Sequence, residues 1–232
     1  DPVAMSVTPA AGSPTPAEFR AAVTATREPP DEGNPAVRLG QALRALNRSV
    51  VGSTAPDDVV ADVTAVVERL TERLAAHAHP TRYEQAQAIS GTGTFLNHPM
   101  IGPANPCAPP IRMHIEGDAL VGEVTFSTPQ EGPPGHGYGG YLAAGFDAIL
   151  LMTAGINGLG GPTRSLAVRY RKPTPLHTAL RYTARIEAVE ERMVRIRGAL
   201  VGEDGTVYVE GEAEVARGAR IGGQFPPPAS PL

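Results

Sequence analysis

The spacing of apolar positions predicts helices in the first part of the chain. Between residues 34 and 53 apolar side chains recur at mostly helical intervals, and Asn34 followed by Pro35 is a favourable helix start. After residues 55–57 a second stripe of Val and Leu runs to about His79, with acidic residues at its amino end. The pattern therefore predicts two helices that form a hairpin.

From Ile111 the spacing changes to that of strands. Residues 111–127 alternate as two strands joined by a turn, and an apolar helix is expected from about Gly139 to Asn157. Four more strands follow without an intervening helix, the last two joined at the turn 203–205. One apolar helix among consecutive strands predicts an α+β fold with an antiparallel sheet.

The ends of the chain lack this periodicity. Both are rich in Pro, Ala and Ser, which predicts a weakly ordered arm over residues 1–33 and a flexible tail over 221–232. The helical hairpin is expected to be an extension over 34–80, and the strand-bearing domain to occupy 81–220.

Charge and composition narrow the choice of partners. The net charge of the 232 residues is −4, and Lys and Arg are scattered, so we expect no nucleic-acid or membrane-surface partner. No run approaches the roughly 18 apolar residues of a membrane span. The single cysteine, Cys107, cannot form an internal disulfide, which fits a reducing compartment. We therefore expect a cytoplasmic protein.

A literal GxGxxG precedes the predicted apolar helix, at Gly135, Gly137 and Gly140. A dinucleotide site needs this loop in a parallel sheet, with an acidic residue about 20 positions later for the ribose. Between Asp147 and Glu187 there is no Asp or Glu, and the strands that follow are spaced as hairpins. The sequence therefore disfavours a nucleotide site.

Asp147 stands out within the predicted helix. From residue 132 to 163 it is the only charged side chain apart from any charge on His136, and its surface neighbours on the helix are Ala, Leu and Met. A carboxylate in such a setting is costly unless it is paired, hydrogen-bonded or used chemically. Asp147 is therefore a candidate for a structural hydrogen bond or for catalysis.

The stretch GPPGHGYGGYLAAGFDAIL, followed by PTRSLAVRYRKPTPL, resembles the hotdog-fold acyl-CoA thioesterases, in particular the phenylacetyl-CoA thioesterase-like group. That group has two glycines at the start of the central helix, an acidic residue eight positions after the first, and a strand ending in a basic residue, Pro, Thr, Pro, Leu. The resemblance covers roughly residues 97–217. It implies a hotdog fold, an antiparallel sheet wrapped around a central helix. One departure is Tyr138, where the family usually has His.

The resemblance also implies roles for individual residues. It assigns the N–H of Gly139 to the oxyanion and makes Asp147 the general base or the nucleophile. Thr163 and Ser165 lie where family members carry a hydroxyl that holds water or substrate, and two residues apart on a strand they are expected to share a face. The expected substrate-binding residues are His136, Tyr138, Gly140, Arg169, Arg171 and Lys172, the three basic ones as contacts for the phosphates of coenzyme A.

The spacing of Gly139 and Asp147 requires two subunits. Eight residues of α-helix span about 12 Å, so the two residues of one chain cannot both contact one thioester carbon. We therefore expect a homodimer or a dimer of dimers, with each site shared between subunits.

Three functions remain open at this stage. The first is hydrolysis of an acyl-CoA or acyl-carrier thioester, with no cofactor because coenzyme A is part of the substrate. The second is an acyl-CoA hydratase or dehydratase, which would need a His paired with the carboxylate. The third is acyl binding without catalysis, which the loss of the family His permits. No cluster of His, Cys and carboxylates has metal-ligand spacing, so no metal is expected.

Overall fold

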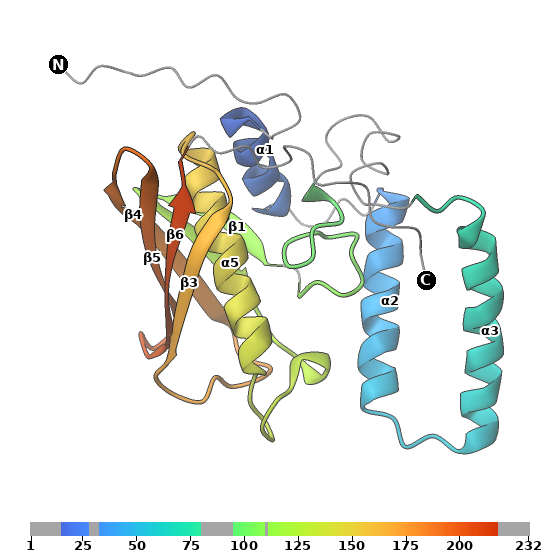
Figure 1. The fold of residues 1–232 in the computed structure, drawn as a ribbon. Coiled ribbons are helices and arrows are strands. Elements are labelled where there is room, and N and C mark those ends of the chain that lie inside the picture. The colour runs from blue at the N-terminus through green and yellow to red at the C-terminus, as the bar shows by residue number, and fades with distance from the viewer. Residues whose placement is uncertain (1–14, 28–32, 80–94, 110, 218–232) are drawn as a thin grey trace.

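The computed structural model describes residues 15–27, 33–79, 95–109 and 111–217. Two helices stand to one side of a sheet whose face is covered by another long helix (Figure 1). The elements, in chain order, are α1 (Pro16–Arg27), α2 (Pro35–Val51), α3 (Asp57–Ala75), β1 (Arg112–Glu116), β2 (Ala119–Val124), η2 (Thr128–Gln130), α5 (Gly139–Ile156), β3 (Thr163–Tyr170), β4 (Leu180–Val189), β5 (Met193–Gly202) and β6 (Val207–Ala216).

The six strands form one sheet in the order β1-β2-β4-β5-β6-β3, and every neighbouring pair is antiparallel. Tight turns join β1 to β2, β4 to β5 and β5 to β6, with Gly117 and Gly205 at positive φ, where a side chain would be strained. This confirms the predicted α+β class with an antiparallel sheet. It also removes the parallel setting that a GxGxxG loop needs to bind a dinucleotide.

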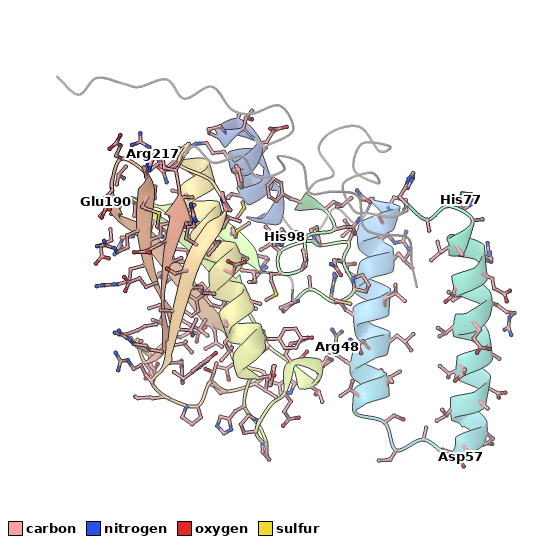
Figure 2. The ribbon with its side chains drawn as sticks, viewed as in Figure 1. Arg48, Asp57, His77, His98, Glu190 and Arg217 are labelled. Atoms are coloured by element: carbon pink, nitrogen blue, oxygen red, sulfur yellow. The ribbon has the colours of Figure 1, made fainter. Side chains whose placement is uncertain are left out.

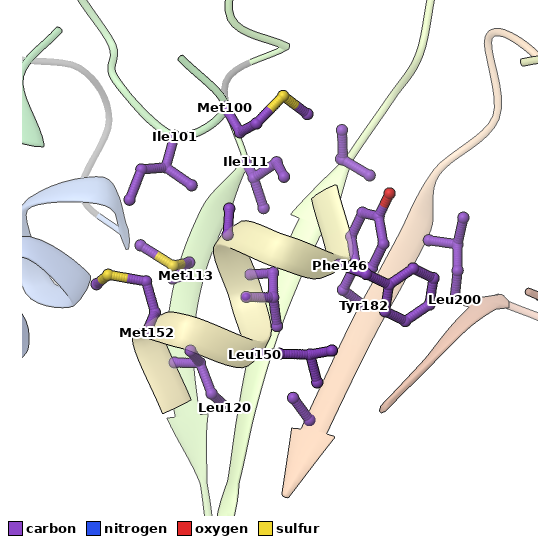
Figure 3. Close-up of a cluster of buried hydrophobic side chains, with 14 of the residues drawn as sticks. Met100, Ile101, Ile111, Met113, Leu120, Phe146, Leu150, Met152, Tyr182 and Leu200 are labelled. Carbon is purple, nitrogen blue, oxygen red and sulfur yellow. The ribbon is translucent and has the colours of Figure 1, made fainter. Parts of the chain in front are cut away.

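Helix α5 forms the core with the inner face of the sheet. It is apolar on nearly every side, and Phe146, Ile149 and Leu150 are fully buried. The ring of Phe146 packs edge-on against Tyr182 of β4, with centroids 5.0 Å apart (Figure 3). Among the described helices, α5 alone is long and apolar enough to cross a membrane, and 61% of it is buried within the protein. Its apolar character is therefore explained by contact with the sheet.

Tyr182 should make the stability of the core depend on pH. Its hydroxyl donates to the carbonyl oxygen of Leu142 at 3.0 Å, and burial raises its pKa far above the ordinary value. The unfolded chain can ionise this phenol above pH ~10 while the folded chain cannot, so the free energy of unfolding should fall as pH rises beyond that point. Tyr182→Phe should remove this component, and losing the hydrogen bond should cost about 1 kcal/mol at neutral pH. Urea unfolding at neutral and alkaline pH measures both effects.

Helix α1 differs from the sequence prediction, which assigned its residues to a weakly ordered arm. Phe19, Ala22 and Val23 are buried at helical spacing, and α1 packs against β1 and α5. The ring of Phe19 lies over Gly155 of α5, where an added Cβ would come within 2.5 Å of it. The short apolar repeat was hidden by the Ala, Thr and Pro around it. The remaining predictions for the ends, at 1–14 and 221–232, lie outside the described residues.

The two predicted helices of the extension are confirmed as α2 and α3. Asn34 caps α2, accepting from the N–H of Ala36 at 3.0 Å. Arg44 fixes α2 to the loop before the sheet, donating to the carbonyl oxygens of Asn105 at 2.7 Å and Pro103 at 2.8 Å. Helix α3 ends at Ala75, four residues earlier than predicted, and all of its residues are exposed. The predicted boundary at residues 80 and 81 lies outside the described residues.

Candidate active site

The loop before α5 is held in a fixed shape by hydrogen bonds. Glu131 accepts from the N–H of Gly135 at 2.6 Å through its carboxylate. Gly135 has φ +76°, a conformation that favours glycine. At the end of the loop, the N–H of Tyr138 donates to the carbonyl oxygen of Gln130 at 2.8 Å. The glycines of the GxGxxG stretch therefore shape a turn that presents the start of α5.

The two stretches that carry the family resemblance, the loop before α5 and the segment after β3, contact each other. The N–H of Gly137 donates to the carbonyl oxygen of Thr174 at 2.8 Å, and the N–H of Leu176 donates to that of Gly135 at 3.1 Å. The segment after β3 and the loop before α5 thus form one wall. Beside it lies an open cleft of about 410 Å³, lined by Pro133, His136, Gly137, Gly139, Leu142, Tyr170, Arg171, Lys172, Pro173 and Thr174.

Gly139 opens α5 and borders the cleft. As the first helical residues, Gly139 and Gly140 have no acceptor one turn earlier in the helix, and in the described part of the chain neither N–H donates to another backbone group. The carbonyl oxygen of Gly139 accepts from the hydroxyl of Tyr170 at 2.8 Å. The helix start is thereby fixed through its carbonyl, while its N–H groups remain available for a developing negative charge.

Asp147 lies two turns further along α5 and is partly buried. One of its carboxylate oxygens accepts from the hydroxyl of Thr163 at 3.1 Å. Thr163 is the first residue of β3, so the strand and the helix together orient the carboxylate. The structure therefore brings together two of the four residues predicted to be catalytic.

Ser165 does not join this pair. The register of β3 against β6 shifts between Thr163, opposite Val215, and Ser165, opposite Glu214. This β-bulge places the two hydroxyls on opposite faces, and that of Ser165 donates to Glu214 at 3.3 Å. The prediction that Thr163 and Ser165 share a face was wrong, because strict alternation assumes an unbroken strand.

His136 and Tyr138 occupy different sides of the loop. The ring Nδ1 of His136 lies 2.8 Å from the carbonyl oxygen of Pro134, to which it must donate, so Nε2 remains for another partner. His136 lines the cleft, whereas the exposed ring of Tyr138 packs beside Gly140 and Tyr141. The residue at the position of the family His therefore does not line this cleft.

The three basic residues predicted to contact phosphates lie at two different hollows. Arg169 and Arg171 border a hollow on the outer face of the sheet, and Arg171 donates to Glu210 at 2.6 Å. Arg171 and Lys172 border the cleft. Near Lys172, the pKa of Asp204 is lowered, chiefly by the N–H of Thr206 and to a smaller extent by the charge of Lys172. Of the three, Arg171 and Lys172 line the same cleft as Gly139, and Arg169 does not.

Sequence reasoning missed Tyr170, Glu131 and Thr174. Tyr170 lies between Arg169 and Arg171, which were predicted to contact phosphate. It also continues the alternation of Leu166 and Val168, which pack against the core. That alternation is the signal that could have placed its ring against α5. The carboxylate of Glu131 and the carbonyl oxygen of Thr174 accept hydrogen bonds from backbone N–H groups. Such bonds cannot be predicted from the residue types in the sequence.

Among the described residues, no group of three or more His, Cys, Asp or Glu side chains could hold a metal ion. The arrangement instead offers a hydrogen-bonded carboxylate, helix-start N–H groups and an open cleft with cations at its rim. Such groups suit reactions in which negative charge develops on a carbonyl oxygen.

The architecture and this arrangement define a protein with the hotdog fold, as the sequence predicted. It is similar to the crystal structure of protein RHA08564, a thioesterase superfamily protein, with 28% identity over 82% of this chain and 93% of that one, at a TM-score of 0.73. A hypothetical thioesterase from Streptococcus pneumoniae with coenzyme A is 17% identical over 47% of this chain and 90% of that one, at a TM-score of 0.44. Thioesterase superfamily member 2 from Mus musculus is 17% identical over 46% and 80%, at 0.43. No protein-family model and no curated protein matches the sequence.

Proposed function

We propose that this protein is a thioesterase that hydrolyses acyl-CoA to a free acid and coenzyme A. The observation that carries the proposal is the partly buried Asp147, held by Thr163, on the same helix whose first N–H groups border a cleft. A carboxylate can activate water or attack directly, and helix-start N–H groups can stabilise an oxyanion. The likeness to a thioesterase superfamily structure supports the same chemistry.

The complete site is proposed to lie between two subunits joined along β3. This strand is the edge of the sheet, and its two ends contact the two site groups: Thr163 bonds Asp147, and Tyr170 bonds Gly139. If β3 pairs antiparallel with its copy about a two-fold axis, Tyr170 of one subunit lies opposite the partner subunit's Thr163. That pairing brings Gly139 towards the partner subunit's Asp147. Within one helix the two residues are ~12 Å apart, so they cannot act on the same thioester.

In the proposed reaction, Asp147 takes a proton from water as the water oxygen attacks the thioester carbonyl carbon. The carbonyl oxygen becomes an oxyanion and accepts from the N–H of Gly139 of the other subunit. When the carbon–sulfur bond breaks, the thiolate takes up the proton held by Asp147. In the alternative route, Asp147 attacks the carbon itself, expels the thiolate and forms an anhydride that water then cleaves. Single-turnover hydrolysis in ¹⁸O-water identifies the second route when water cleaves the anhydride at the carbonyl carbon of Asp147, because the label then enters Asp147, whereas the first route places label only in the released acid.

Coenzyme A is the proposed carrier because Lys172 and Arg171 line the same cleft as Gly139. Ammonium and guanidinium groups pair well with phosphates. Leu142 and Pro133 give the same cleft apolar surface, which suits an acyl or pantetheine chain.

Thiol release from a panel of aliphatic and aromatic acyl-CoA esters tests the proposed function. We expect turnover with at least one ester, detected as free thiol. Hydration of enoyl-CoA without thiol release would instead indicate a hydratase. Tight binding of acyl-CoA with neither reaction would indicate a non-catalytic acyl-binding protein.

Mixing two inactive variants tests the shared site. Gly139→Pro and Asp147→Asn damage different halves of each site, so a mixed dimer contains one site with both defects and one intact site. After dissociation and random reassociation of equal amounts, about a quarter of wild-type activity should return. Each variant treated alone is the control and should stay inactive. No recovery despite proven subunit exchange would contradict a site that is shared between subunits.

A further inference from the structure

Tyr170 bonds a peptide group of the proposed active site from the edge strand of the sheet. Side chains of the sheet extend both towards α5 and away from it (Figure 2). Tyr170 is one of those that reach α5, because its hydroxyl donates to the carbonyl oxygen of Gly139 at 2.8 Å. Both residues line the cleft. The hydroxyl therefore holds the start of α5 at the point where the cleft lies beside it.

The backbone that carries Tyr170 is fixed against β6. The next residue, Arg171, donates its N–H to the carbonyl oxygen of Tyr208 at 2.8 Å. On the same face of β3, the preceding Leu166 and Val168 pack against the core. Because a strand positions a side chain more precisely than a loop does, the phenol hydroxyl has a defined place relative to α5.

The bond at this carbonyl oxygen acts on the N–H of the following residue. The C=O of Gly139 and the N–H of Gly140 belong to one planar peptide group, so a bond that holds the oxygen also holds the direction of the N–H. A hydrogen bond accepted by the oxygen polarises the group and strengthens its N–H as a donor. Tyr170 therefore acts on the second N–H of α5.

This second N–H is available for a ligand. Gly140 has no acceptor one turn earlier in α5, and in the described part of the chain its N–H donates to no other backbone group. The first N–H groups of a helix point out of its amino end together, so those of Gly139 and Gly140 have the same general direction. Both positions need glycine, because an added Cβ would lie 2.5 Å from Tyr138 at residue 140 and 3.2 Å from Tyr170 at residue 139.

We infer that Tyr170 is a positioning residue, which directs and strengthens the N–H of Gly140 as a second oxyanion donor beside that of Gly139. The inference rests on the proposed thioesterase function. As water attacks the thioester, the carbonyl oxygen gains negative charge, and two donors at the helix start bind it together. Tyr170 gives no proton to the reaction and acts only through the peptide group.

Tyr170→Phe tests this role, because it removes the hydroxyl and keeps the ring. We expect kcat for thiol release to fall about 3–10-fold, the effect of losing one hydrogen bond, with KM unchanged. The loss falls on kcat because the donors bind most strongly in the transition state, where the oxygen is charged. Tyr208→Phe removes a hydroxyl from the neighbouring strand β6 and should keep the kcat of the wild type. A folded Tyr170→Phe with unchanged kcat, or with a change in KM alone, would overturn the inference.

The carbonyl stretching band of a bound ¹³C-labelled thioester gives a second readout that a purely structural role would not move. Asp147→Asn serves as the background, because it slows hydrolysis while the substrate is bound. Adding Tyr170→Phe should shift the band to higher frequency, since weaker hydrogen bonds polarise the carbonyl less. A band that stays at the same frequency would contradict an effect of Tyr170 on the oxyanion donors.

Replacing Gly140 by glycolic acid tests the route through the peptide group. The ester oxygen takes the place of the N–H, so kcat should fall about 10²-fold, the usual loss for one oxyanion donor. Tyr170→Phe should then lower kcat no further, because the N–H on which it acts is gone. A further loss of the same size as in the unmodified chain would overturn the inference. Failure of the proposed function would differ from all these results, because the wild type itself would release no thiol.

Discussion

Asp147→Asn is expected to lower the rate of thioester hydrolysis by about 10²–10⁴-fold, the usual contribution of a positioned base. The amide has nearly the same shape as the carboxylate, and its oxygen can still accept from Thr163, which bonds Asp147 at 3.1 Å. What disappears is the ability to take up a proton or to attack carbon. Because Asp147 is only partly buried, the variant should fold with nearly the stability of the wild type. Thiol release under saturating substrate measures the loss in kcat.

A matched control is available for this prediction. Asp118→Asn makes the same chemical change at an exposed residue that pairs with Arg185 at 2.9 Å, and it should leave kcat unchanged. Circular dichroism and urea unfolding establish that both variants are folded. Full activity in a folded Asp147→Asn would remove Asp147 from the chemistry and reduce its bond to Thr163 to a structural contact.

Much of the fold follows from hydrophobic spacing, because the elements that build the core are long and strongly patterned. Helix α5 begins at Gly139, as predicted, and ends at Ile156, one residue before the predicted end. The alternation in β4 to β6 and the Asp204-Gly205 turn define antiparallel neighbours without further information. Helix α1 escaped prediction because three apolar residues give too little signal among Ala, Thr and Pro, and its packing against β1 and α5 stabilises it.

The candidate site was less predictable, because its geometry depends on features that residue types do not encode. A bulge after Thr163 turns Ser165 to the outer face, and no local residue marks that bulge. Arg171 was expected at a phosphate, yet it has a cross-strand partner in Glu210, which is 39 residues away in the sequence. Pairings of this kind are known only once the register of β3 against β6 is fixed.

Gly139→Pro should lower kcat by about 10²–10³-fold, the usual effect of losing one oxyanion donor. Proline has no N–H, and it is well tolerated at the first position of a helix. Tyr138, the preceding residue, already has φ −67° and ψ 126°, the conformation that a following proline favours. The substitution therefore deletes the proposed donor while keeping the start of α5. Thiol release and urea unfolding should separate a large loss of activity from a small change in stability.

Gly139→Ala is the control that isolates the N–H, because it adds a side-chain carbon and keeps the donor. A Cβ at this position would lie 3.2 Å from the hydroxyl of Tyr170, so the tyrosine must move by a few tenths of an ångström in both variants. Whatever loss Gly139→Ala shows therefore measures that displacement, and the additional loss in Gly139→Pro measures the N–H. Equal activities in the two variants would mean that the oxyanion is stabilised elsewhere, with the N–H of Gly140 as the nearest remaining donor at the start of the helix.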